Sequence, residues 1–220
     1  MSRAVAAFDL DGTVLRGQSG SAWAWHLAGR RLIPARVAVR VAVLLVRYRQ
    51  GAPLDYDRLA EELLGEFRGR PIAHFEALLD RFVADRLVPQ IRREARATMA
   101  RLEAEGAHVV LASAALAPIV ERMAGHLPVA GWIATELAAP VDGAFAGRLG
   151  GPIRYGTAKL DAIRAHAEAR FAAWRLTHAF SDHQSDLELL EAAELPVAVN
   201  PSPGLARIAR ARAWPIARWR

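Results

Sequence analysis

The sequence predicts an α/β protein with a Rossmann-like, three-layer parallel sheet and a helical cap inserted after the first strand. Short apolar runs alternate with helical segments from about residue 89 onward, which is typical of a parallel sheet covered by helices. One further apolar run, 4–8, precedes a stretch with helical spacing and no confident strand. We therefore expect a core of residues 1–14 and 89–220, with residues 15–88 as the cap.

In the first part of the chain, residues 4–8 form an apolar run that ends at polar turn residues, so we expect a buried strand there. Helical spacing of apolar residues follows, with a break at Pro34 and a turn at 50–53. The expected helical segments include 23–27, 37–48, the apolar face of Leu59, Leu63, Leu64 and Phe67, and the apolar face of Phe75, Leu78, Leu79 and Phe82.

In the second part, a helix is expected from about 89 to 105, where Gly106 is a typical C-terminal signal. Asp142-Gly143 between apolar residues predicts a hairpin. The remaining expected strands are 109–112, 132–134, 179–180 and 197–199, and the remaining expected helices lie around 119–123, 157–173 and 186–193.

The composition excludes several classes of protein. Of 220 residues, 53% are hydrophobic and 24% charged, which rules out a disordered or low-complexity chain. No cysteine is present, so disulfides, cysteine-ligated zinc and a cysteine nucleophile are excluded. The net charge of +6 is the difference between 29 basic and 23 acidic residues, and only Lys159 among the basic residues is a lysine. No nucleic-acid-binding motif accompanies this charge, so we expect no nucleic-acid partner.

The apolar segment 37–46 is shorter than the ~20 residues of a membrane span. We expect no integral membrane segment and a soluble, cytoplasmic protein. The arginines around this segment leave two interpretations, a helix of the cap core or a weak association with a membrane surface, and we favour the first. The oligomeric state cannot be read from the sequence.

Acidic residues follow two expected strands. Asp9 and Asp11 come directly after the first strand, and in an extended segment residues i and i+2 point the same way. Asp182 and Asp186 follow strand 179–180. Ligand sites of open α/β sheets gather at the carboxyl ends of the strands, so these carboxylates should converge. Four carboxylate groups around one pocket require a hard divalent cation, and oxygen ligands indicate Mg²⁺.

Two further residues suit phosphate binding. Ser113 ends strand 109–112 before a helix, where a hydroxyl and backbone N–H groups can receive a phosphate. Lys159 opens a helix after Gly156-Thr157, where its charge opposes the helix dipole, so a role in stability is not expected. A lysine is a compact cation that can neutralise a phosphoryl group.

These four motifs, Asp9-Leu10-Asp11-Gly12-Thr13, Ser113, Lys159 and the Asp182/Asp186 pair, resemble those of haloacid dehalogenase (HAD) superfamily phosphatases, of the phosphoserine-phosphatase-like subfamily IB. The resemblance covers essentially the whole chain. It implies that Asp9 attacks phosphorus and that Asp11 is the general acid and base. It further implies Mg²⁺ binding by Asp9, the Asp11 carbonyl and Asp182, with Asp186 behind them, and phosphate binding by Ser113, the N–H of Ala114, and Lys159.

Three positions depart from the resemblance. Gln18 stands where phosphoserine phosphatases usually carry a glutamate, Ser113-Ala114-Ala115 replaces Ser-Gly-Gly, and Ser185 replaces an asparagine. The implied chemistry survives these changes, but specificity for phosphoserine does not follow. Gln18, His183 and Ser185 are candidate substrate contacts, and Trp23, Arg47 and Tyr48 are candidate cap residues that read the substrate.

The sequence thus predicts an Mg²⁺-dependent phosphomonoester hydrolase that acts on a small phosphorylated metabolite through an aspartyl-phosphate. Two alternatives remain open: a phosphotransferase or mutase of the same fold, and a regulatory module that binds a phosphorylated ligand without catalysis.

Overall fold

The computed structural model describes residues 2–49 and 63–220. Six parallel strands form one sheet in the order β3-β2-β1-β4-β5-β6. The strands are β1 (Arg3–Phe8), β2 (His108–Leu116), β3 (Gly131–Thr135), β4 (Trp174–Ser181), β5 (Leu195–Val199) and β6 (Ile216–Ala217). The helices are α1 (Ser19–Gly29), α2 (Ala35–Arg49), α4 (Ile72–Phe82), α5 (Arg93–Ala104), α6 (Ala117–Ala124), α7 (Thr157–Glu168), α8 (Leu187–Ala192) and α9 (Pro203–Ala211).

The central strand β1 is buried on both faces, which explains why its sequence is a continuous apolar run rather than an alternating one. Val5 and Ala7 belong to the core on one face of the sheet, and Ala6 and Phe8 belong to the core on the other. All four side chains are fully buried. The expected parallel α/β fold is therefore confirmed.

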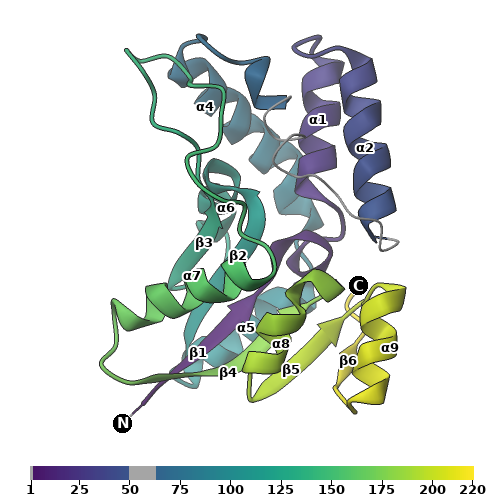
Figure 1. Cartoon of the computed structure of the whole chain (residues 1–220), viewed down its shortest axis with the longest axis vertical. Coiled ribbons are helices and arrows are strands. Elements are labelled where there is room, and N and C mark those ends of the chain that lie inside the picture. The colour runs from purple at the N-terminus through teal and green to yellow at the C-terminus, as the bar shows by residue number, and fades with distance from the viewer. Residues whose placement is uncertain (1, 50–62) are drawn as a thin grey trace.

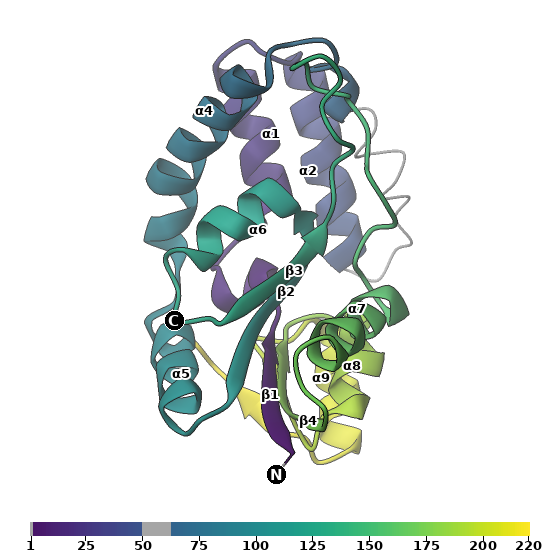
Figure 2. The same cartoon turned by 90° about the vertical axis from the view of Figure 1, so that its left-hand side faces the viewer.

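Helices cover both faces of the sheet, so that the core has three layers (Figure 2). On one face, α7, α8 and α9 contribute apolar side chains such as Ile163, Leu190 and Leu205. On the other face, α5 contributes Met99 and Leu102. The carboxyl ends of the central strands point toward the remaining helices of the molecule.

Above those carboxyl ends stand α1, α2 and α4 (Figure 1). They pack around aromatic side chains: the rings of Trp23 and Phe82 lie 4.9 Å apart, and Phe75 meets Trp23 edge-on at 5.9 Å. In α2, Val37, Ala38 and Val41 are buried in the same core, whereas Val39, Val43 and Val46 are exposed. One side of the apolar segment 37–46 thus packs inside the protein.

Among the helices in the described parts of the chain, none has the length and apolar character needed to cross a bilayer.

The segment between β3 and α7 leaves the sheet and packs on the helices above it; we call residues 136–152 the strap. Its tip is the predicted hairpin: Asp142 and Gly143 have φ of 49° and 74°, and Val141 pairs with Ala144. Phe145 stacks on Phe75 with ring centroids 4.4 Å apart. A segment late in the sequence is therefore part of the helical layer's core.

Several predicted boundaries differ from the structure. The helix expected from residue 89 begins at Arg93, because Pro89 lies in a short 3-10 turn and Ile91 and Arg92 are extended. The helix expected to reach 173 ends at Glu168. Helix α9 and the two-residue β6 were not predicted, since Pro203-Gly204 has the composition of a turn. The turn predicted at 50–53 and Leu59 lie outside the described residues.

Candidate active site

A cavity of about 150 Å³ lies between the carboxyl ends of the strands and the helices above them. The predicted catalytic, metal-binding and phosphate-binding residues line this cavity, as do three candidate substrate contacts: Asp9, Asp11, Gln18, Ser113, Ala114, Lys159, Asp182, His183, Ser185 and Asp186. They come from separate parts of the sequence, and the parallel sheet brings them together because its strands end at one edge.

Asp9 lies at the centre of the cavity floor. It continues β1 in extended conformation, its backbone N–H donates to the Phe180 carbonyl of the neighbouring strand at 2.9 Å, and its side chain is buried. Thr13 Oγ1 donates to Asp9 Oδ2 at 3.1 Å, and Lys159 Nζ donates to Oδ1 at 2.9 Å. Burial raises the pKa of Asp9 to about 7, opposed by Lys159 and reinforced by Asp186.

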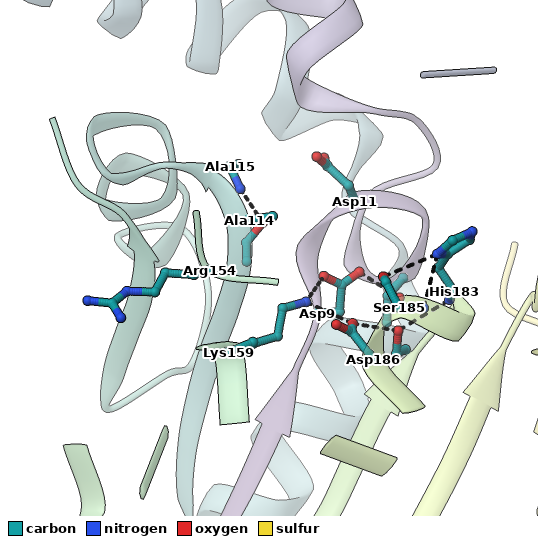
Figure 3. A network of polar contacts seen from close by, with 12 residues as sticks. Asp9, Asp11, Ala114, Ala115, Arg154, Lys159, His183, Ser185 and Asp186 are labelled. Atoms are coloured by element: carbon teal, nitrogen blue, oxygen red, sulfur yellow. Dashed lines mark hydrogen bonds and ion pairs between the residues drawn. The ribbon is translucent and has the colours of Figure 1, made fainter. Parts of the chain in front are cut away.

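Lys159 links two carboxylates. It lies in the first turn of α7, is buried, and donates to Asp9 and, at 2.7 Å, to Asp186 Oδ2 (Figure 3). Burial alone would lower the pKa of this ammonium, but the carboxylates of Asp186 and Asp9 outweigh it and raise the pKa above its usual value. The lysine is therefore held charged beside Asp9.

The loop after β4 positions the other two acids. Ser181 ends the strand and donates from Oγ to Asp186 Oδ2 at 2.8 Å, which orients that carboxylate toward Lys159. Asp182 is buried beside them, and its backbone carbonyl accepts a 2.7 Å hydrogen bond from the N–H of Ser202. The Asp182/Asp186 pair thus belongs to the same floor as Asp9.

Asp11 differs from the simple expectation. Its carboxylate points away from Asp9 (Figure 3) and accepts hydrogen bonds from Ser19 N–H at 2.7 Å and from Ser19 Oγ at 2.8 Å. The reason is local: the chain turns back on itself over Leu10–Val14 instead of continuing the strand, with Gly12 at a φ of 82° and the Leu15 N–H donating to the Leu10 carbonyl at 2.8 Å, so i and i+2 do not share a direction. Both carboxylates still line the one cavity.

The surroundings of Ser113 also differ from those expected from the sequence. We expected it between the end of a strand and a helix start, but β2 continues to Leu116 and α6 begins only at Ala117. The pairing of β2 with β3 is irregular between Ala112 and Leu116, and the Ala115 N–H donates to Ser113 Oγ at 3.1 Å within this irregular stretch. The hydroxyl and the backbone of Ala114 reach the cavity from an irregular strand end.

The candidate substrate contacts differ in how firmly they are held. His183 Nδ1 accepts from the N–H of Ser185 at 3.2 Å and lies 3.1 Å from its Oγ, so these two side chains form one unit. Gln18 precedes α1 at the cavity wall. Trp23 also lines the cavity, whereas Arg47 is exposed and not among its lining residues. The Tyr48 side chain lies outside the described part of the structure.

Four polar residues contact the site without having been singled out. Thr13 and Ser181 lie beside predicted acids, so their position in the motifs was an available signal. Ser19 holds Asp11, and Thr135 Oγ1 donates to the Ala114 carbonyl at 2.8 Å. No sequence pattern marks these last two, because they reach the site through the fold.

The donor set fits a divalent cation. Asp9, Asp182 and Asp186 are three buried carboxylates with one buried lysine among them, which leaves a formal excess of two negative charges. Oxygen ligands in this charge state suit Mg²⁺. Within residues 2–49 and 63–220, no three His, Cys, Asp or Glu side chains form a ready metal cluster.

The parallel sheet and the buried aspartate–lysine pair at its carboxyl edge define an α/β protein with a polar ligand site at the strand ends. The family model described as haloacid dehalogenase-like hydrolase matches residues 6–191. The chain therefore belongs to the haloacid dehalogenase-like hydrolases, and its assignment as a phosphatase of this family is confirmed. Phosphatases of the family generally use Mg²⁺.

Relatives of the chain include proteins with different names. A phosphoserine phosphatase of Mycobacterium tuberculosis is 30% identical over 97% of this chain and 70% of its own. An inhibition of morphological differentiation protein of Streptomyces azureus is 30% identical over 98% of this chain and 78% of its own. A histidinol-phosphatase of Neisseria meningitidis is 26% identical over 96% of this chain and 97% of its own.

Solved structures share the fold. A protein with unknown function from Bordetella pertussis Tohama I has a TM-score of 0.86 and 30% identity, covering 99% of both chains. A substrate-bound phosphoserine phosphatase has a TM-score of 0.71 and 18% identity, covering 99% of this chain and 93% of its own.

Proposed function

We propose that this protein is an Mg²⁺-dependent phosphomonoester hydrolase that works through an aspartyl-phosphate on Asp9. The observation that carries the proposal is the position of Asp9: a buried carboxylate at the end of the central strand, 2.9 Å from a buried lysine ammonium. A nucleophilic carboxylate beside a fixed cation suits attack on a negatively charged phosphoryl group.

In the first step, an Asp9 oxygen attacks phosphorus and the bond to the alcohol oxygen breaks. Asp11 enters this step in its protonated form, exchanges its hydrogen bond with Ser19 Oγ for one to the leaving oxygen and transfers its proton there, so that a neutral alcohol departs and Asp11 is left ionised. Lys159, Ser113 and the N–H of Ala114 hold the phosphoryl oxygens, which stabilises the charge that develops on them.

In the second step, water attacks the aspartyl-phosphate, and Asp11, now ionised, takes a proton from that water. The bond between phosphorus and the Asp9 oxygen breaks, which regenerates the Asp9 carboxylate and releases inorganic phosphate. One residue thus serves as acid and then as base, as the two half-reactions require.

The residues that would hold Mg²⁺ are Asp9, Asp182 and the backbone carbonyl of Asp11, with Asp186 orienting this set from behind. The ion, when bound, would neutralise charge on the phosphoryl oxygens. Its binding is supported by the formal excess of two negative charges on the cavity floor.

We further propose that residues 15–88 act as the cap over a core of 1–14 and 89–220. The position of α1, α2 and α4 over the carboxyl ends of the strands supports this division (Figure 1). The strap adds a piece of the later sequence to the cap, since Phe145 stacks on Phe75.

The proposal is tested by hydrolysis of p-nitrophenyl phosphate with Mg²⁺ and with EDTA, for the wild type beside Asp9→Asn. We expect Asp9→Asn to lower kcat by at least about a thousandfold, because an amide cannot replace the nucleophile. Circular dichroism checks that the variant is folded. Normal turnover by folded Asp9→Asn, or full activity in EDTA, would contradict the proposal.

A further inference from the structure

The wall of the active-site cavity is mainly apolar where it leaves the catalytic floor. Beyond the predicted site residues, it is lined mainly by aliphatic and aromatic side chains. From the helices above come Trp23, Val41, Leu63 and Leu64, from the end of β2 and α6 come Leu116 and Ile119, and from the segment before α7 come Ile153 and Tyr155. A substrate whose phosphate sits at Asp9 would place its organic part against these side chains.

In the described part of the cavity lining, every charged side chain belongs to the predicted catalytic, metal-binding and phosphate-binding set, so none is placed to pair with a charge on that organic part. Its charged side chains are Asp9, Asp11, Asp182, Asp186 and Lys159. Lys159 is bonded to two carboxylates, and Asp11 is held by both the N–H and the hydroxyl of Ser19. Arg154, next to the wall residue Ile153, directs its guanidinium away from Asp9 (Figure 3).

An aromatic ring could replace a carboxylate as the partner of a substrate ammonium, but Trp23 is already enclosed by other rings. His26 stacks on it at 5.6 Å, Phe82 lies at 4.9 Å, and Phe75 meets it edge-on, which leaves Trp23 1% exposed. A cation needs an open ring face to be stabilised in this way. Among the described lining residues, the wall therefore offers an alkyl or aryl group contact area and no charged side chain outside the catalytic floor as the partner of an ammonium or carboxylate; Tyr155, 44% exposed, is the tyrosine ring of this lining.

We propose that the physiological substrate is a phosphate monoester of an uncharged, apolar alcohol, and not of an amino acid or amino alcohol. The inference rests on the proposed phosphatase function and specifies its substrate class. Burial of an unpaired charge costs far more than burial of a methyl group gains, so the discrimination is strong. The cavity has a volume of about 150 Å³ and must hold the phosphoryl group as well, so only the part of the alcohol nearest its oxygen, a ring or a short chain, can lie inside it.

The test compares substrates with similar leaving groups, so that only the charge of the organic part changes. n-Propyl phosphate and O-phosphoethanolamine differ by a methyl group in place of an ammonium group. Benzyl phosphate adds the ring, and phosphoserine and histidinol phosphate represent the charged alternatives. We expect kcat/KM for n-propyl phosphate to exceed that for O-phosphoethanolamine by at least about tenfold, and benzyl phosphate to be better still.

A variant tests whether the missing charge is the cause. Gln18→Glu introduces a carboxylate at the cavity wall, and we expect it to shift the ratio of kcat/KM toward O-phosphoethanolamine by at least about tenfold. Val141→Glu adds the same charge at the exposed tip of the strap, outside the cavity lining, and should leave the ratio unchanged. An unchanged ratio in Gln18→Glu, or an equal shift in Val141→Glu, would overturn the inference.

The assay separates this inference from the proposed function. If p-nitrophenyl phosphate is hydrolysed in an Asp9-dependent way while phosphoserine or histidinol phosphate exceeds the apolar esters, the phosphatase stands and the substrate class is wrong. If no ester is hydrolysed, both are wrong. Benzyl phosphate in solution and decyl phosphate in phosphatidylcholine vesicles distinguish a dissolved alcohol from one held in a membrane, and a preference for either over O-phosphoethanolamine supports the inference.

Discussion

Lys159 is the lysine of a chain whose other basic residues are all arginine, and its surroundings explain why arginine would not serve. Its ammonium lies between Asp9 and Asp186 in a buried position, at 2.9 and 2.7 Å. A guanidinium is larger and planar and binds carboxylates in a two-point fork, so it does not fit between two carboxylates that approach one nitrogen atom. A compositional exception in the sequence thus corresponds to a geometric requirement in the site.

Replacing this lysine should reduce stability, contrary to the expectation from its position in the first turn of a helix, because its ammonium is buried between two carboxylates. In Lys159→Met, Asp9 and Asp186 are left buried without their cation, and breaking a buried ion pair from one side costs about 3–5 kcal/mol. We expect a loss of this size in the free energy of unfolding, measured by urea denaturation in EDTA.

The matched control is Arg164→Met on the same helix. Arg164 pairs with Asp161 at 3.2 Å, but both side chains are more than half exposed. Such surface pairs contribute little, so the control should change stability by no more than ~0.5 kcal/mol. Equal effects of the two substitutions would show that the buried cluster has no special role in stability.

Among the elements, the strap is held by backbone pairing at its base. The N–H of Gly150 donates to the Glu136 carbonyl at 2.8 Å, and the N–H of Ala138 donates to the Arg148 carbonyl at 3.1 Å. The two sides approach so closely that a Cβ on Gly150 would lie 2.6 Å from the carbonyl oxygen of Leu137. Glycine is required here by the close approach of two backbones.

Gly150→Ala should therefore destabilise the protein by about 1–3 kcal/mol, because a backbone carbonyl cannot move aside as a flexible side chain can. Gly151→Ala is the adjacent control, since a Cβ there meets no atom within 4 Å. We expect it to be neutral within ~0.5 kcal/mol or slightly stabilising. Thermal unfolding of both variants checks the difference, and a similar loss in both would argue against backbone contact as the cause.

At the scale of the whole molecule, a histidine pair joins the start of β2 to the end of α7, at the opposite end of the sheet from the active site. His108 Nε2 and His166 Nε2 lie 2.9 Å apart, and Phe171 packs edge-on against His108. Burial, Arg170 and His108 lower the pKa of His166 to about 4, and burial lowers that of His108 as well. Both rings are therefore neutral in the folded protein at pH 7.

This pair makes stability depend on pH. Between about pH 6.5 and 4 the unfolded chain binds a proton at His166 and the folded protein does not, so stability falls as the pH is lowered. We expect the wild type to lose about 1 kcal/mol more than His166→Gln between pH 7.5 and 5, after allowance for solvent screening of a half-buried pair. Urea unfolding at the two pH values measures this.

The control for the pH dependence is His74→Gln, which removes an exposed histidine of α4. This variant should lose as much stability between pH 7.5 and 5 as the wild type does. A His166→Gln variant that loses as much stability as the wild type would show that the pair is not its source.

The sequence by itself was sufficient to predict the parallel fold and to predict which residues lie together at the cavity. The apolar run of β1 indicated a strand buried on both faces, and the acids at the ends of β1 and β4 were expected to meet because parallel strands end at one edge. These signals are local in the chain, so they can be read from it. Helix ends were predicted less well. The helix expected from residue 89 begins at Arg93, because Ile91 is extended and pairs with Leu15.

Only the tertiary structure decided how the site residues are held and what surrounds them. Asp11 turns toward Ser19, Ser113 lies in an irregular strand end, and the strap from the later half of the chain completes the helical layer. The apolar wall of the cavity draws side chains from segments about 130 residues apart, such as Trp23 and Ile153. Sequence patterns report what each segment prefers, whereas these features depend on which segments pack together, because long-range contacts set side-chain direction and burial.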